Sequence, residues 1–157
     1  MTSPPQVEIL LIGVGNLLRG DDAAGKLAAK LVRARNHPSI RVLEHDGEGA
    51  SLIEIWSGAR HVIVVDAVSS DSPPGTIIGF DATQQPLPER VFHNSTHAFG
   101  LHEAVELSRA LKRLPHQLII YGIVGESFDV GAGLSPKVEE AVRQVVKSIF
   151  RELGVGV

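Results

Sequence analysis

Cysteine is absent from the 157-residue sequence, which excludes disulfide bonds, thiolate metal ligands and a cysteine nucleophile. Long hydrophobic runs are absent too, since stretches such as HVIVVDAV (61–68) are far too short to span a bilayer. Charge of one sign does not dominate, because 15 Lys and Arg face 18 Asp and Glu, so nothing favours nucleic acid or an anionic membrane as a partner. The first residues, MTSPPQ, lack the basic and apolar regions of a secretory signal. We therefore expect a cytoplasmic protein that binds neither nucleic acid nor membrane.

The composition that is present is typical of a single globular domain. Hydrophobic residues make up 43% of the chain and charged residues 21%, as in ordinary soluble proteins. A chain of this length can bury a full hydrophobic core, and we find no internal repeat, linker or low-complexity tract. We therefore expect one domain over residues 1–157.

Runs rich in Val and Ile alternate along the chain with helical patterns. Strands are expected at 7–14, 40–45, 61–68, 76–81 and 117–124, and helices at 21–35, 49–59, 97–114 and 136–153. This alternation predicts an α/β three-layer sandwich, with a twisted, mostly parallel five-stranded sheet and helices on both faces. The fourth strand follows the third after a short turn, which makes that pair a candidate for antiparallel pairing.

The last helix has the clearest end signals. Ser135 is a typical N-cap residue, and Pro136 occupies the first helical position. Gly154 is placed to terminate the helix. The third predicted helix has Leu101, Val105, Leu111 and Leu114 as its expected inward-facing positions.

The loop GVGNLLRGDD (13–22) looks like a phosphate-binding turn but ends in two carboxylates, Asp21 and Asp22. Leu18 stands where a dinucleotide fingerprint needs its third glycine. Two acidic side chains at the helix start would also repel phosphate. These features disfavour a nucleotide-binding regulatory module, which remains an alternative. Ser127, in GESFD, lacks the final glycine of a nucleophile elbow.

Three side chains that bind metals well follow or close predicted elements at one edge of the sheet. Asp22 follows the first strand, Asp66 closes the third, and His97 begins the helix after the long loop. Sites in such sheets form beyond the carboxyl ends of the strands. Two carboxylates and one imidazole suit Ni, Zn, Mn or Fe and leave positions open for water or substrate.

Structural roles for the same residues stay open. Asp21 or Asp22 is also a natural helix N-cap, and an isolated histidine such as His97 is more often a surface or packing residue. His93 is a competing candidate for the imidazole ligand. Asp66 is harder to explain structurally, because burying a carboxylate without a partner is costly.

Four stretches in this order carry a family resemblance: GVGNLLRGDD, VVDAV, STHAFGL and GIVGESFDVGAGLSPKV. The chain resembles, over about residues 7–153, the hydrogenase maturation proteases. These aspartyl-type endopeptidases remove the C-terminal extension of the [NiFe]-hydrogenase large-subunit precursor. The resemblance implies that Asp22, Asp66 and His97 are the catalytic, metal-contacting residues. It also implies that nickel is delivered in the precursor, that zinc or another divalent ion can act as a surrogate, and that cleavage waits for nickel.

The sequence departs from the family pattern at two places. Ala23 stands where many members have glycine after the acidic pair, and HDGEGAS (45–51) replaces a D-G-G-T type turn. Glu48 in that turn is expected to be solvated, or to contact the precursor, rather than to bind metal. Another metal-assisted hydrolase on the same scaffold, with its own zinc or manganese, is the alternative enzyme.

Overall fold

A computed structural model describes residues 9–88, 91 and 97–154 of the chain. Its elements, in chain order, are β1 (Ile9–Val14), the 3-10 helix η1 (Gly20–Ala23), α1 (Ala24–Ala34), β2 (Ile40–His45), α2 (Gly49–Trp56), β3 (His61–Val68), β4 (Ile77–Asp81), α3 (Leu101–Ala110), β5 (Gln117–Val124) and α4 (Pro136–Glu152). Across the described part of the chain, no helix is long and apolar enough to cross a membrane.

The five strands form one sheet in the order β2-β1-β3-β5-β4. The pairs β1–β2, β1–β3 and β3–β5 are parallel, and β4 runs antiparallel to β5. The fourth strand was expected to pair with β3 in an antiparallel arrangement. It is antiparallel to its neighbour, but that neighbour is β5, so the predicted partner is wrong. Both sides of β3 are already occupied by β1 and β5, so β4 pairs with the remaining edge of β5.

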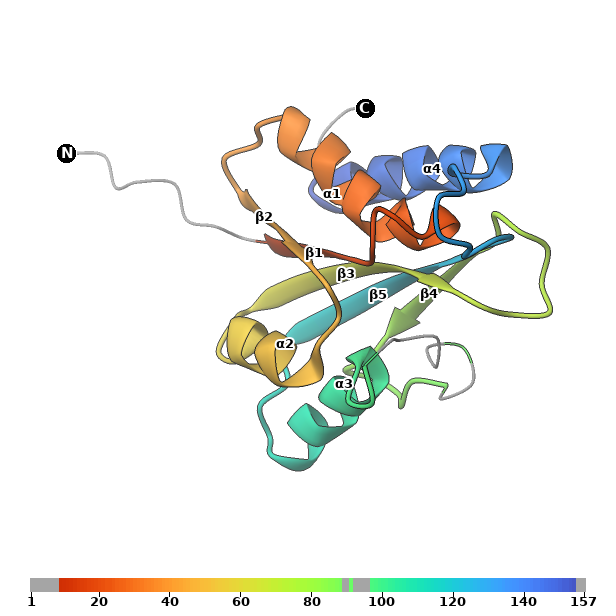
Figure 1. The fold of residues 1–157 in the computed structure, drawn as a ribbon. Coiled ribbons are helices and arrows are strands. Elements are labelled where there is room, and N and C mark those ends of the chain that lie inside the picture. The colour runs from red at the N-terminus through yellow and green to blue at the C-terminus, as the bar shows by residue number, and fades with distance from the viewer. Residues whose placement is uncertain (1–8, 89–90, 92–96, 155–157) are drawn as a thin grey trace.

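Helices cover both faces of the sheet, which confirms the predicted three layers (Figure 1). On one side, α1 and α4 bury residues such as Val32, Val142 and Ile149 against β1, β3 and β5. On the other side, α2 and α3 pack around Trp56 and Leu52. The buried indole N–H of Trp56 donates a hydrogen bond of 3.0 Å to Ser108 Oγ, which links these two helices.

The helix α3 is shorter than expected at both ends. It is preceded by Gly100 in an extended conformation and ends at Ala110. Lys112, two residues later, adopts a left-handed backbone with φ 57°, which a continuing helix cannot contain. Leu101 and Val105 are buried as expected. Leu111, expected to face inward, is 53% exposed because it lies beyond the helix end.

The helix α4 begins and ends where the sequence indicates. Ser135 is its N-cap residue, Pro136 opens it, and Gly154 follows its end with φ 70°. The Ser135 hydroxyl nevertheless makes no capping bond to its own helix. It donates instead to Asp21 Oδ2 at 2.7 Å.

Asp21 is a fully buried carboxylate that joins three segments of the chain. Its Oδ1 accepts a hydrogen bond from Ser135 N at 2.7 Å. Its Oδ2 accepts from Glu126 N at 2.7 Å and Ser127 N at 3.1 Å, besides the Ser135 hydroxyl. These bonds tie the loop after β1 to the loop after β5 and to the start of α4. The expectation that one of the two aspartates caps α1 is wrong, because Ala23 is the N-cap residue and no side chain caps it.

The hydrogen bonds to Asp21 also set its ionisation. Burial by itself would raise the pKa of this carboxyl, but the N–H groups of Ser135, Glu126 and Ser127 and the Ser135 hydroxyl lower it below the ordinary value. The carboxylate is therefore the form that the fold stabilises.

Replacing Asp21 with alanine should destabilise the protein by about 3 kcal/mol, because it leaves several buried donors without an acceptor. Urea unfolding at pH 7 measures the change. Asp71→Asn, in the exposed part of the β3–β4 loop, is the control and should change stability little. Equal stability of the Asp21→Ala variant and the wild type would contradict the structural role.

The same contribution has a defined pH dependence. Since the folded-state pKa of Asp21 is depressed, its stabilisation is complete above the unfolded pKa of about 3.9 and disappears as the pH falls through the lower folded value. The stability gap between wild type and Asp21→Ala should therefore be constant from pH 7 to about 5 and shrink only in stronger acid.

Candidate active site

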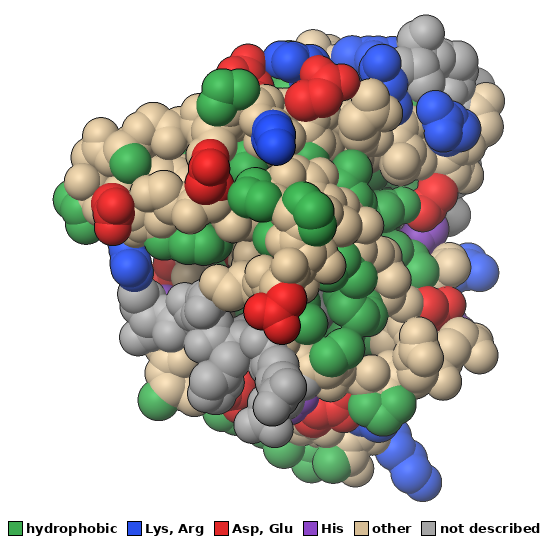
Figure 2. Space-filling view, turned by 90° about the vertical axis from the view of Figure 1, so that its right-hand side faces the viewer, with side chains coloured by type: hydrophobic (Ala, Val, Ile, Leu, Met, Phe, Trp, Pro, Cys, Tyr) green, Lys and Arg blue, Asp and Glu red, His purple; other side chains and the backbone are tan. Residues whose placement is uncertain are grey.

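The carboxyl ends of β1, β3 and β5 lead to the edge of the sheet that carries the predicted site. Figure 2 looks at this side of the molecule, where charged side chains of both signs lie among hydrophobic ones. Asp66 is on β3, paired in register with Gly122 of β5. Asp22 lies in η1, directly after the loop that leaves β1.

Asp22 and Asp66 lie close enough for the charge of one to act on the other. Burial raises the pKa of the Asp66 carboxyl well above its ordinary value, and the negative charge of Asp22 raises it further. Burial also raises the pKa of Asp22, although the charges of Arg19 and Lys26 and a backbone hydrogen bond from Asn16 oppose this. The two carboxyl groups therefore cannot both be ionised in this poorly solvated position without repelling each other.

The loop after β1 is held closely around Asp22. Asn16 Oδ1 accepts a hydrogen bond from Leu18 N at 2.9 Å, and Asn16 N donates to Asp22 O at 3.2 Å. Gly15 has φ 150°, and a Cβ at this position would lie 1.9 Å from Asp22 O. Ala23 has an ordinary φ of −74°, so the alanine that replaces the family glycine fits without strain.

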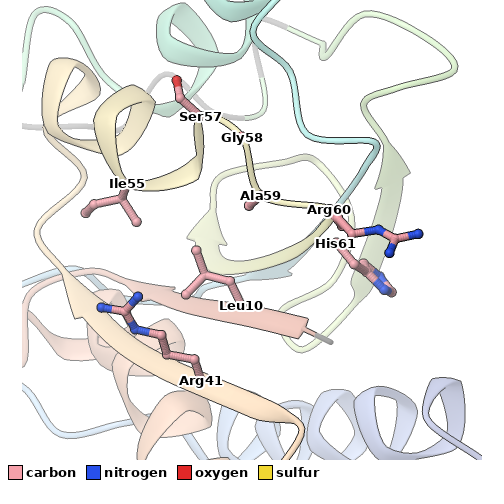
Figure 3. A pocket seen from close by; sticks show the side chains of 8 residues that line it. All are labelled: Leu10, Arg41, Ile55, Ser57, Gly58, Ala59, Arg60 and His61. Carbon is pink, nitrogen blue, oxygen red and sulfur yellow. The ribbon is translucent and has the colours of Figure 1, made fainter. Parts of the chain in front are cut away.

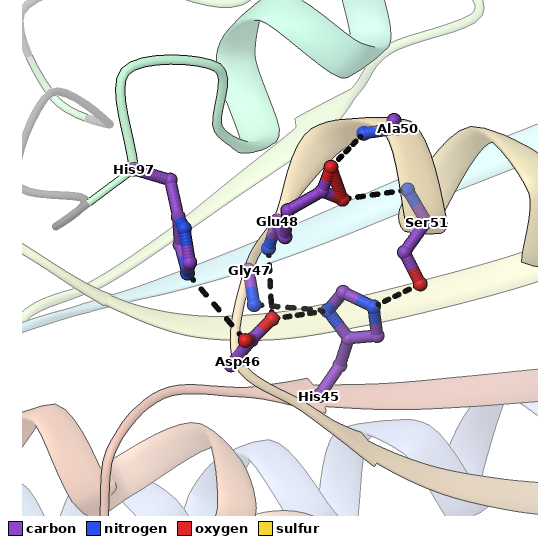
Figure 4. A network of polar contacts seen from close by, with 7 residues as sticks. All are labelled: His45, Asp46, Gly47, Glu48, Ala50, Ser51 and His97. Carbon is purple, nitrogen blue, oxygen red and sulfur yellow. Dashed lines mark hydrogen bonds and ion pairs between the residues drawn. The ribbon is translucent and has the colours of Figure 1, made fainter.

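His97 lies beside a different acidic residue (Figure 4). Its Nε2 is 3.6 Å from Asp46 Oδ2, and its side chain is 29% exposed. Among residues 9–88, 91 and 97–154, no three His, Asp or Glu side chains are placed to hold one metal ion. The set of Asp22, Asp66 and His97 therefore stays a prediction, and His93 lies outside the described residues.

His45 and Asp46, at the end of β2, are polar residues of this edge that the sequence interpretation missed. Asp46 Oδ1 accepts a hydrogen bond from Glu48 N and lies 3.5 Å from His45 Nδ1. The Glu48 N–H, with a smaller contribution from a positive charge on His97, lowers the pKa of Asp46. The available signal was a histidine that ends the predicted strand 40–45 and an aspartate that follows it directly.

His45 is held as a neutral imidazole. Burial lowers its pKa, although Asp46 and Glu48 oppose the shift. Its Nδ1 accepts a hydrogen bond from Gly47 N at 2.9 Å. The proton consequently belongs on Nε2, which lies 3.0 Å from Ser51 Oγ and can donate to it.

Glu48 is the N-cap residue of α2, a structural role that the sequence interpretation did not assign to it. Its Oε1 accepts from Ala50 N at 3.1 Å and its Oε2 accepts from Ser51 N at 2.8 Å. A carboxylate at a helix start satisfies backbone donors and complements the helix dipole.

Hollows of different sizes occur in the described structure. A small one of about 120 Å³ is lined by Asp22 of the carboxylate pair together with Arg19, Ser69 and Phe128. A larger one of about 420 Å³ lies near the amino end of β3, with Arg41, Arg60 and His61 among its lining residues (Figure 3). No carboxylate lines the larger hollow, so its chemistry does not suit a cation.

Known proteins with similar sequences belong to the family that the sequence motifs indicate. A sequence profile of the hydrogenase maturation protease family matches residues 26–152. The hydrogenase 2 maturation protease of Escherichia coli (strain K12) is 29% identical over 157 residues, covering 95% of this chain and 94% of the relative.

Solved structures give the same result. The hydrogenase maturating endopeptidase HybD from E. coli superposes with a TM-score of 0.71 at 28% identity, covering 93% of each chain. A [NiFe] hydrogenase maturation protease from Thermococcus kodakarensis superposes with a TM-score of 0.69 at 25% identity, covering 92% of this chain and 97% of its own. The profile match and these relatives confirm the resemblance: the chain belongs to the hydrogenase maturation protease family, whose members are endopeptidases.

Proposed function

We propose that this endopeptidase removes the C-terminal extension of a [NiFe]-hydrogenase large-subunit precursor, and that it acts on precursor already carrying nickel. The observation that carries the proposal is the pair of neighbouring, poorly solvated carboxylates, Asp22 and Asp66. Such a pair favours a divalent cation, which relieves the repulsion between the two charges.

The proposed third ligand is His97, which lies beside Asp46 rather than between the two aspartates. Histidines that bind metals usually present one ring nitrogen to a carboxylate or carbonyl, which fixes the ring orientation. Asp46 is suited to this role because its pKa is lowered and it is held by the Glu48 N–H. The three ligands would then come together when the precursor brings its nickel.

In this proposal the side chains of the protease hold and orient the reacting region of the precursor. Asp22 and Asp66 bind the incoming ion at the carboxyl edge of the sheet, and His97 completes the set. A bound divalent metal polarises a carbonyl or lowers the pKa of water. Nickel is here part of the substrate, and zinc or another divalent ion can act as its surrogate.

The first test compares nickel-loaded and nickel-free precursor as substrates. We expect cleavage of the loaded form only, since the ligands meet only around the ion. The size of the large subunit on a denaturing gel is the measurement. Equal cleavage of both forms, or of neither, would contradict the proposal, and stoichiometric zinc or manganese in freshly purified protease would favour the alternative metal-assisted hydrolase.

Asp66→Asn should reduce the rate of processing by more than about 100-fold. Loss of a residue that only hydrogen-bonds to a metal ligand typically costs about 10- to 100-fold, and loss of a ligand should cost more. The variant should also be more stable than the wild type at pH 7, because a poorly solvated charge next to Asp22 is gone. Since the folded pKa of Asp66 is raised, ionisation weakens the wild-type fold as the pH rises above about 4. Urea midpoints of both proteins at pH 4 and pH 7 measure this difference.

The control for Asp66→Asn is Asp81→Asn, at the end of β4 on the opposite edge of the sheet. It should process nickel-loaded precursor at the wild-type rate. Normal processing by Asp66→Asn would remove this residue from the site.

Asp46→Asn should lower kcat/KM on nickel-loaded precursor by about 10- to 100-fold, because His97 loses its carboxylate partner. A steady-state assay on folded variants measures the change. The control is Glu54→Gln, on the exposed side of α2. Unchanged kinetics for Asp46→Asn would mean that Asp46 does not orient His97.

A further inference from the structure

Arg19 is the described cation nearest in sequence to the carboxylate pair, and part of its guanidinium has no partner. Its Nε is shielded from solvent and forms no hydrogen bond among the described residues. A buried charged donor without an acceptor costs more than an ordinary lost hydrogen bond. Such a group in a native protein calls for an explanation, and an absent ligand is one of them.

The position of Arg19 indicates where such a ligand would bind. Arg19 lines the hollow of about 120 Å³ together with Asp22, Ser69 and Phe128. The charge of Arg19 acts on Asp22 and opposes the rise that burial causes in its pKa, yet within the described chain the two side chains form no ion pair. The hollow is smaller than the roughly 300 to 1,000 Å³ of ordinary small-molecule pockets. It therefore suits one chemical group of a larger substrate.

The backbone around Arg19 is fixed by several contacts. Arg19 N donates to Asn16 O at 3.3 Å, and Arg19 O accepts from Asp22 N at 3.1 Å. The next residue, Gly20, has φ 56°, and a Cβ there would lie 2.5 Å from Ser127 O. Asp21 N donates to the same carbonyl at 2.8 Å. The arginine is thus carried by a rigid turn, which pre-orders it for binding.

We infer that Arg19 binds the carbonyl oxygen of the scissile peptide and then, after cleavage, the new C-terminal carboxylate of the large subunit. This inference rests on the proposed function, which places the scissile bond beside Asp22 and Asp66. The product carboxylate adds a negative charge beside Asp22, Asp66 and the ion that they bind, so a further cation stabilises the position where the product acid forms. An arginine provides it, because its planar donors match carboxylate oxygens.

The chemistry balances with water as the only co-reactant. Water adds to the scissile carbonyl carbon, and the bond from that carbon to nitrogen breaks. The nitrogen of the released extension takes up both protons of the water and leaves as an ammonium group, while the large subunit retains both oxygens as a carboxylate. Arg19 contacts one of these oxygens before and after the step and undergoes no change of charge.

The test measures processing of nickel-loaded precursor by Arg19→Ala and Arg19→Lys. Loss of one charge-assisted hydrogen bond should lower kcat/KM by about 10- to 100-fold in Arg19→Ala. Arg19→Lys should lose less, since it keeps the charge but not the planar donors. Millimolar guanidinium chloride should partly restore Arg19→Ala, which a merely structural role would not allow. Arg33→Ala, on α1, is the matched control and removes an arginine paired with Glu44.

A second measurement concerns product inhibition by the mature large subunit, which carries the new carboxylate. Its inhibition constant should rise by about 10-fold or more for Arg19→Ala. The wild-type protein distinguishes a failure of the proposed function from a failure of the role inferred for Arg19. If the wild type fails to cleave nickel-loaded precursor, the proposed function fails. If the wild type cleaves and Arg19→Ala matches it in kcat/KM and in product inhibition, only the role of Arg19 is overturned.

Discussion

The buried carboxylate of Asp21 is the interaction on which the geometry of the site depends. It accepts four hydrogen bonds from the loop after β5 and the start of α4. These bonds fix the turn in which Arg19 and Asp22 lie. A loop of this kind would otherwise move, because glycines at 15 and 20 leave its backbone few constraints of its own.

Two adjacent aspartates therefore have opposite properties for a physical reason. Asp21 is surrounded by donors, which lower its pKa and stabilise its charge. Asp22 has one backbone donor and two more distant cations, and burial raises its pKa. The first carboxylate is satisfied by the fold itself. The second, with Asp66, has negative charge that the described residues do not fully compensate, which is the property expected of a site that meets a cation from outside.

The acidic pair and the His97–Asp46 pair come from different segments at the same edge of the sheet. Lys26 acts electrostatically on both Asp22 and Asp46, which is consistent with their common location. The position of His97 is determined by the segment before α3 and not by a strand. A side chain that lies outside the sheet can adjust to a substrate more readily than one on a strand.

The sequence alone determined the layered α/β fold, four of the five strands almost to the residue, and the start and end of α4. These features depend on local patterns: apolar runs, Pro136 at a helix start and Gly154 after its end. The sequence also singled out Asp22 and Asp66, because a parallel sheet places the carboxyl ends of neighbouring strands at one edge.

Only the tertiary structure decided which partners these residues have. Asp21 contacts residues more than a hundred positions away, and β4 pairs with β5 because β3 has no open edge. Glu48 caps a helix and Asp46 lies beside His97 because of the shape of the turn after β2. The amino-acid sequence of this turn does not specify that shape. Hydrogen bonds and burial depend on which residues lie close together in space. Local sequence patterns determine only which neighbours along the chain come together, not which distant segments do.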